Sequence, residues 1–173
     1  MILIELILAQ PQDFPRIENL MQFYNYELSD TAAVDFADHG LYQLQPKATY
    51  WAQHLIAAFL IHVDDKLAGF VVVDNEVLEP TSQYNMGYFF VARRYRGQGV
   101  GRIVAAKLLA MFPGRWEIYH LAQNQSAGQF WRASLIADGR GGVAAISNLR
   151  QKERLIYDEP CIWFGFDTTA ASA

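Results

Sequence analysis

The chain has 173 residues, a formal net charge of −4 and a sequence pI of about 5.5. This length suits one domain spanning residues 1–173, and a hydrophobic content of 52% argues against intrinsic disorder. The acidic balance leaves no basic footprint on the chain as a whole, so nucleic acid is disfavoured as a partner.

The first ten residues, MILIELILAQ, form a short apolar segment that Glu5 interrupts. The segment lacks a basic n-region and is too short to span a membrane. We therefore expect a buried strand over residues 2–8, no membrane partner and a cytoplasmic protein. Cys161 is the single cysteine and the histidines lack the spacing of a zinc site, so we expect neither a disulfide nor a bound metal.

Helical spacing of apolar residues follows this strand. Asp13 can cap a helix that carries Ile17, Met21 and Leu28 on one face and fades after Leu28. The sequence predicts an irregular stretch over residues 31–46 and then a short helix around residues 50–55.

From residue 59 onward the sequence predicts strands. Residues 59–63 and 67–73 are apolar runs around a polar turn at 64–66, which is typical of a hairpin. A polar loop over 75–82 precedes an aromatic-rich strand over 84–91. The remaining predictions are a helix over 100–111, a strand over 116–121, a helix capped by Asn124 or Ser126, a turn at 139–142, one late strand over 155–166 and a fraying tail over 167–173.

A glycine-rich loop, RGQGVG over residues 96–101, lies between a predicted strand and a predicted helix. Glycines there allow sharp turns and leave backbone N–H groups uncovered. The first N–H groups of a helix have no internal partner and lie at the positive end of the helix dipole. The loop is therefore suited to bind a phosphate or pyrophosphate.

Two common phosphate loops do not fit this segment. A Walker loop ends in Gly-Lys-Ser/Thr, whereas Gly101 is followed by Arg102 and Ile103. A dinucleotide fingerprint needs GxGxxG at the start of a βαβ unit, whereas these glycines alternate and come late in the chain.

The pattern that does fit is Arg/Gln-x-x-Gly-x-Gly/Ala after a strand, matched by Arg96, Gly99 and Gly101. It resembles the GCN5-related N-acetyltransferase (GNAT) superfamily, in which this loop holds the pyrophosphate of coenzyme A. A second motif of that superfamily, Asn-x-x-Ala-x-x-Phe-Tyr, is matched by residues 124–131 except that Trp131 replaces the tyrosine. The resemblance covers residues 58–135 well and the flanks only by element order.

The resemblance implies a mixed α/β fold with a central, mostly antiparallel sheet and helices on both faces. One splayed parallel pair is expected, formed by the strands that end at Val91 and Leu121. It also implies acetyl-CoA as co-substrate. The residues expected to contact it are Phe89, Phe90, Val91, Arg96, Gly97, Gln98, Gly99, Val100, Gly101, Arg102, Asn124 and Trp131.

Within that set, the pantetheine arm is expected to pair with the backbone of residues 89–91 like an added strand. A backbone N–H of Phe90 or Val91 would polarise the thioester carbonyl. Asn124 suits a plain helix cap as well as a ligand contact, and Trp131 suits core packing as well.

The chemistry implied is direct attack of an amine on the thioester. In many relatives the tyrosine at the end of the second motif is the acid, but the indole of Trp131 does not transfer a proton at neutral pH. Tyr88, Tyr119 and His120 are substitutes by location, although a lone strand histidine also fits a structural role.

The acceptor is expected to bind over residues 13–58, where Tyr24, Glu27 and Tyr42 combine aromatic rings with a carboxylate. The same residues also fit a surface helix that packs aromatics inward. The acceptor would be a small-molecule or peptide amine, and the protein a monomer or homodimer. Two other functions stay open: a coenzyme A-binding sensor without turnover, and a phosphate-binding interaction domain.

Overall fold

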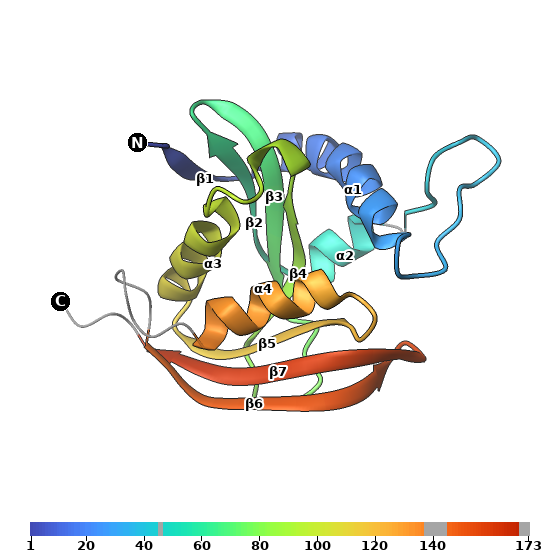
Figure 1. The fold of residues 1–173 in the computed structure, drawn as a ribbon. Helices are drawn as coiled ribbons and strands as arrows, with labels where there is room; N and C mark the ends of the chain where they lie inside the picture. Colours follow the sequence, from blue (N-terminus) through green and yellow to red (C-terminus); the bar gives the residue numbers. More distant parts are fainter. Residues whose placement is uncertain (45–46, 137–144, 170–173) are drawn as a thin grey trace.

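A seven-stranded sheet organises the residues that the computed structural model describes, which are 1–44, 47–136 and 145–169. Its strand order is β1-β2-β3-β4-β5-β7-β6, with helices on both faces (Figure 1). The elements are β1 Ile4–Leu8, α1 Phe14–Leu28, α2 Lys47–Gln53, β2 Leu55–Val63, β3 Lys66–Asp74, β4 Tyr84–Val91, α3 Val100–Met111, β5 Gly114–Leu121, α4 Gln125–Ile136, β6 Ala145–Ile156 and β7 Glu159–Thr169, with short 3-10 turns at Pro11–Asp13 and Arg93–Tyr95.

The β2–β3 hairpin forms the middle of the sheet, as the apolar runs predict. Its turn places Asp64 and Asp65 at φ angles of 47° and 62°, which is the left-handed pair that a tight hairpin turn requires. Most side chains of both strands are buried on both faces. The helices therefore have to cover the sheet from two sides.

Side chains that alternate between the two faces of the sheet form two separate hydrophobic cores. One core packs α3 and α4 on the sheet through residues such as Val104, Leu108 and Leu135. The other packs α1 and α2 on the opposite face through Ile17, Met21 and their neighbours. Because neighbouring residues of a strand point to opposite faces, adjacent positions of β4 and β5 serve different sides of the molecule.

The predicted parallel pair is present between β4 and β5. These two strands pair only at Tyr84 with Trp116 and at Asn85 with Glu117, and then they separate toward their C-terminal ends (Figure 1). Every other neighbouring pair in the sheet is antiparallel. The mixed α/β fold with one splayed parallel pair is therefore confirmed.

The C-terminal part differs from the prediction of a single late strand. Two strands, β6 and β7, form a long hairpin around Tyr157 and Asp158, whose φ angles are 50° and 63°. The expected fraying from residue 167 is wrong up to residue 169, because β7 continues and the buried Thr168 Oγ1 accepts the N–H of Gly114 at 3.0 Å. Residues 170–173 and the turn predicted at 139–142 lie outside the described residues.

The short helix predicted around residues 50–55 begins earlier. It spans Lys47–Gln53, and Leu55 already belongs to β2, where it pairs with Asp74. Within the described parts of the chain, no helix is long and apolar enough to cross a membrane.

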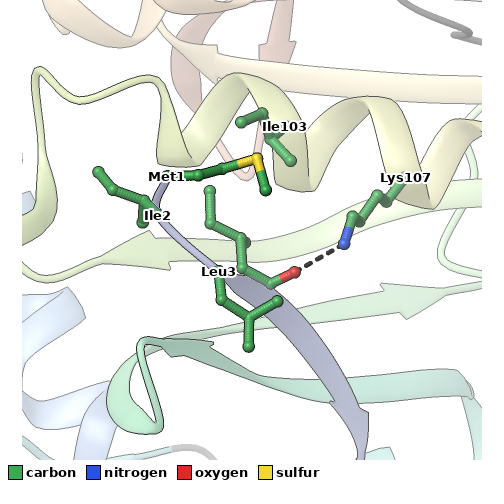
Figure 2. Close-up of a pocket in the computed structure, with 6 residues that line it drawn as sticks. Met1, Ile2, Leu3, Ile103 and Lys107 are labelled. Atoms are coloured by element: carbon green, nitrogen blue, oxygen red, sulfur yellow. Dashed lines mark hydrogen bonds between the residues drawn. The ribbon is translucent and has the colours of Figure 1, made fainter.

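An apolar hollow lies between the N-terminal segment and α3. Figure 2 shows Met1, Ile2 and Leu3 beside Ile103 of α3, with the amine of Lys107 donating to the Ile4 carbonyl at 2.6 Å. This bond ties the edge strand β1 to α3. The hollow offers hydrophobic contacts and an amine that is already bonded, so it is not the candidate site.

Candidate functional site

The separation of β4 from β5 opens the middle of the sheet. Gly87, Tyr88 and Phe89 lie in a central strand yet remain partly exposed, because β5 has moved away from them. The register shifts at Gly87, where Val72 faces Tyr88 but Val73 faces Met86. A bulge of this kind bends a strand and redirects its backbone groups.

The backbone of β4 beyond the bulge presents alternate N–H groups to the opening. The Ala92 N–H donates to the Ala68 carbonyl at 2.8 Å. Every second residue before it, including Phe90, therefore also directs its backbone N–H toward β3. The N–H groups of Phe89 and Val91 therefore point toward β5, where no strand pairs with them among the described residues. Of the two groups suggested by the sequence, Val91 and not Phe90 presents its N–H to the opening.

The glycine loop continues directly from this strand. Gly97 and Gly99 have φ angles of 73° and 80°, and Gly99 is the N-cap of α3. Ile103 is the first residue of the helix to donate to a preceding carbonyl, that of Gly99 at 3.1 Å. Within the described residues the N–H groups of residues 97–102 make no hydrogen bond, which is the arrangement that binds an anion at a helix N-terminus.

Side chains of the loop hold its shape. Gln98 donates to the Arg94 carbonyl at 2.9 Å, and Arg96 Nε donates to the Val91 carbonyl at 2.7 Å. Arg93 and Arg96 also bind the Glu27 carboxylate, with N–O distances of 2.7 and 3.3 Å. The hydrogen bond from Arg93 lowers the pKa of Glu27, so α1 supplies a charged brace for the loop.

This brace changes the expected role of two residues. The sequence predicts that Glu27 contacts the acceptor, and in the structure its carboxylate binds Arg93 and Arg96 at the loop. Arg96 is tied to Glu27 and to the strand, so its guanidinium supports the loop. Arg102 is exposed on the first turn of α3.

Gly101 serves helix packing. A Cβ atom there would lie 3.0 Å from Cε2 of Phe130 in α4, whereas one at Gly97 or Gly99 would meet nothing within 4 Å. The neighbouring Val100 is buried in the core. A side chain at Gly101 would therefore press on the Phe130 ring, which would have to move by a few tenths of an ångström.

The second motif begins α4 as the sequence predicts. Asn124 Oδ1 accepts hydrogen bonds from the Ala127 N–H at 3.1 Å and the Ser126 hydroxyl at 3.2 Å, which makes Asn124 the cap. Trp131 is buried, and its ring lies 5.1 Å from that of Phe89. Trp131 thus packs against the strand that borders the opening.

Tyrosines gather on the α1–α2 side of the opening. The rings of Tyr24 and Tyr88 meet edge to face at 5.2 Å. Burial raises the pKa of each of these two hydroxyls to about 12. Burial, together with the hydroxyls of Tyr157 and Tyr24, also raises the pKa of Tyr119. These phenols are therefore protonated at neutral pH.

Tyr42 contacts other residues than Tyr24, Tyr88 and Tyr119 do. Its ring packs on Phe36 at 4.6 Å, and Gln22 holds both its N–H and its carbonyl. Tyr42 thus fastens the segment after α1 to that helix, in agreement with the packing role that the sequence also allowed.

Three residues of this face were missed by sequence reasoning. Lys47 Nζ donates to the Tyr88 hydroxyl at 2.6 Å, and the Tyr50 hydroxyl donates to Asp74 Oδ2 at 2.5 Å. Asp74 is buried at the end of β3, and a Cβ at Gly87 would clash with it. No local motif indicates these residues, because α2, β3 and β4 meet only in the folded chain.

His120 lies on the other face, under α4. A Cβ added at Gly128 would lie 3.0 Å from His120 Cε1, and the Phe164 ring is 6.0 Å away. Its Nδ1 contacts the Leu121 carbonyl at 2.8 Å, and its buried Nε2 has no partner among the described residues. The structure therefore separates His120 from Tyr88 and Tyr119.

The buried His120 predicts a specific acid sensitivity. Burial lowers the pKa of His120 below its usual value, so the unfolded chain binds the proton more readily. Stability should fall as the pH drops below about 6.5, the unfolded histidine pKa. In urea unfolding, His120→Asn should lose less free energy of unfolding than the unaltered protein as the pH falls below about 6.5. His39→Asn, at an exposed position, should lose as much as the unaltered protein. Equal slopes for both variants would contradict the assignment.

Comparison with known proteins agrees with this geometry. Residues 16–135 match the sequence model described as "Acetyltransferase (GNAT) family". The chain belongs to the GNAT acetyltransferase family. A comparison with curated proteins finds no match.

Solved structures share the GNAT fold at low identity. An acetyltransferase from Thermus thermophilus has a TM-score of 0.61 at 14% identity, covering 94% of this chain and 95% of its own. The ribosomal-protein-S18-alanine N-acetyltransferase from Escherichia coli has a TM-score of 0.55 at 14% identity, with 99% and 97% covered. A protein assigned as a streptothricin acetyltransferase from Bacillus anthracis, solved with acetyl coenzyme A, has a TM-score of 0.51 at 13% identity, with 98% of each chain covered.

Proposed function

We propose that this GNAT protein transfers the acetyl group of acetyl-CoA to a primary amine of a small molecule or peptide. The observation that carries the proposal is the unpaired N–H of Val91 at the opening between β4 and β5, next to a loop whose N–H groups, among the described residues, are free to bind an anion. A thioester joined to a pyrophosphate by an extended arm fits this pair of features.

The loop and strand would divide the work of binding. The N–H groups of residues 97–102 would hold the pyrophosphate, and Phe89 and Val91 would pair with the pantetheine amides like a neighbouring strand. Trp131 and Phe89 would cover the arm from the α4 side.

Transfer then requires one bond to form and one to break. The amine nitrogen attacks the thioester carbon, and the Val91 N–H stabilises the negative charge that develops on the carbonyl oxygen. The C–S bond breaks as the attacking nitrogen gives up its extra proton to water or to the departing thiolate, and the products are the amide and free coenzyme A. Departure of the thiolate is undemanding because a thiol has a pKa of about 8.5. Most of the acceleration comes from positioning.

The tyrosines of the site are donors and not bases. Tyr24 and Tyr88 have pKa values raised to about 12, so neither forms a phenolate near neutral pH. Trp131 holds the position of the usual acid and cannot transfer a proton. The acceptor therefore has to arrive as the neutral amine, or lose its proton to water.

This chemistry predicts a simple pH profile. The rate should rise with pH up to the pKa of the acceptor amine, without a second limb from a protein acid. Loss of a general acid or base typically costs ~10²–10⁴-fold in rate. Because neither tyrosine is expected to transfer a proton, Tyr88→Phe and Tyr119→Phe should each lower kcat by less than about tenfold. Steady-state rates of both variants between pH 6 and 10 provide the measurement. A bell-shaped profile combined with a thousandfold loss in either variant would contradict the claim.

Free-thiol release from acetyl-CoA with a panel of amines tests the proposed function. Calorimetric titration with coenzyme A provides the companion measurement. Binding without amine-dependent thiol release would favour the sensor function, which Trp131 in the position of the acid suggests. Absence of both would indicate a phosphate-binding domain with another ligand.

A further inference from the structure

A buried lysine lies at the acceptor side of the opening. Lys47 is 8% exposed, and its Nζ rests 5.0 Å from the ring centres of both Tyr50 and Tyr88. Its hydrogen bond goes to the Tyr88 hydroxyl, and Tyr88 precedes Phe89, whose backbone faces the opening. The ammonium is thus held beside the place where acceptor and thioester would meet.

No carboxylate of the described residues pairs directly with this ammonium. Among the described residues no carboxylate oxygen lies within 4.0 Å of Lys47 Nζ. Burial lowers the pKa of Lys47, while the charges of Glu76, Glu18 and Asp74 oppose that shift and favour the ammonium, as do the two aromatic rings. A buried charge without a partner is costly, and a bound anion would remove that cost.

Four acidic side chains of the described residues are already engaged by other groups. Asp74 accepts hydrogen bonds from Tyr50, from Asn85 and from the Glu76 N–H. Glu117 accepts two backbone N–H groups, those of residues 78 and 79. Glu27 and Glu79 are bound by arginines. These four carboxylates are therefore poorly placed to bind a polycationic acceptor.

We propose that Lys47 binds the carboxylate of an acceptor that carries both an amine and a carboxylate, as an α-amino acid does. This inference rests on the proposed function and names the acceptor class. Lys47 has three donors, of which Tyr88 takes one, and the others can bind a carboxylate. With the carboxylate held there, the adjacent amine is directed toward the thioester.

Matched acceptors and variants test the inference. Leucine and leucinamide differ at the carboxylate, so thiol release from acetyl-CoA is measured with each at a pH fixed relative to its amine pKa. The unaltered protein should prefer leucine at least about tenfold in kcat/KM. Lys47→Met should raise KM for leucine about thirtyfold, the size expected for one lost charge-assisted hydrogen bond, and change leucinamide less than about threefold.

Two further variants serve as controls. Lys66→Met removes an exposed lysine at the start of β3 and should leave the rates with both acceptors unchanged. Lys47→Arg keeps the charge and should recover part of the leucine preference. The coenzyme A affinity of Lys47→Met, measured by calorimetry, should match the unaltered protein, which shows that the fold and cofactor site are intact.

The outcomes separate the two proposals. A preference for leucinamide, or an equal effect of Lys47→Met on both acceptors with coenzyme A affinity intact, overturns the role of Lys47 and leaves acetyl transfer standing. If coenzyme A binds but no amine releases thiol, acetyl transfer fails. Calorimetric leucine binding to the coenzyme A complex then decides the role of Lys47, which is upheld if Lys47→Met abolishes that binding and overturned if it does not.

Discussion

Replacing Gly99 by valine is expected to weaken coenzyme A binding by at least about a hundredfold, or ~2.7 kcal/mol. Gly99 has a φ angle of 80°, which a β-branched residue adopts only with strain. A Cβ there would meet no protein atom within 4 Å, and Gly99 is the N-cap of α3, where the pyrophosphate is proposed to bind. Calorimetric titration with coenzyme A measures the effect.

Gly40 provides the matched control for this variant. Its φ angle is 85°, and a Cβ added to it also meets nothing within 4 Å, but it lies in the segment after α1, away from the loop. Gly40→Val and Gly99→Val should both lower stability by about 1–3 kcal/mol through backbone strain. The loss of coenzyme A affinity should occur in Gly99→Val alone; unchanged affinity in that variant would remove the loop from the site.

Glu117→Gln should lower the free energy of unfolding by about 2–4 kcal/mol. Glu117 is 0% exposed and lies where β4 and β5 last pair. Its carboxylate accepts the N–H groups of Leu78 and Glu79 at 2.8 and 2.7 Å, so it fixes the β3–β4 loop under β5. A glutamine amide offers one acceptor oxygen and turns its NH₂ group toward the other N–H. Urea unfolding measures the loss.

Glu153→Gln is the companion variant for that measurement. Glu153 is an exposed carboxylate on β6, in the same sheet, so its replacement should change stability by less than about 0.5 kcal/mol. If the two variants unfold at the same urea concentration, Glu117 does not fix the loop.

Local patterns explain how much of this fold was predictable. The glycine loop, the cap at Asn124 and the β2–β3 hairpin each depend on residues close together in sequence, and each is found where it was predicted. The splayed pair followed from the resemblance, because two motifs separated by a helix imply a parallel crossover. Turns and helix caps of this kind depend on residues within a few positions of each other, so the sequence indicates them directly.

Long-range contacts explain the errors. The strand β6 is rich in exposed polar side chains, because it is an edge strand, so its apolar pattern is weak. The contacts of Glu27 and Lys47 are not predictable from the sequence, because their partners, Arg93 and Tyr88, are 66 and 41 positions away. Nothing in the neighbourhood of either residue indicates such a partner. Pairing between distant side chains depends on the complete fold.

The contact between β4 and β5 at only two residue pairs has a consequence for how the protein behaves in the cell. Strands β1–β4 and strands β5–β7 form the two halves of the sheet. The two β4–β5 residue pairs and the helix α3 connect these halves. An extended ligand bound between the two halves would contact both of them and stabilise their arrangement. Part of the cohesion of the domain would then come from a metabolite, so its lifetime against proteolysis should rise when acetyl-CoA is abundant and fall when it is scarce.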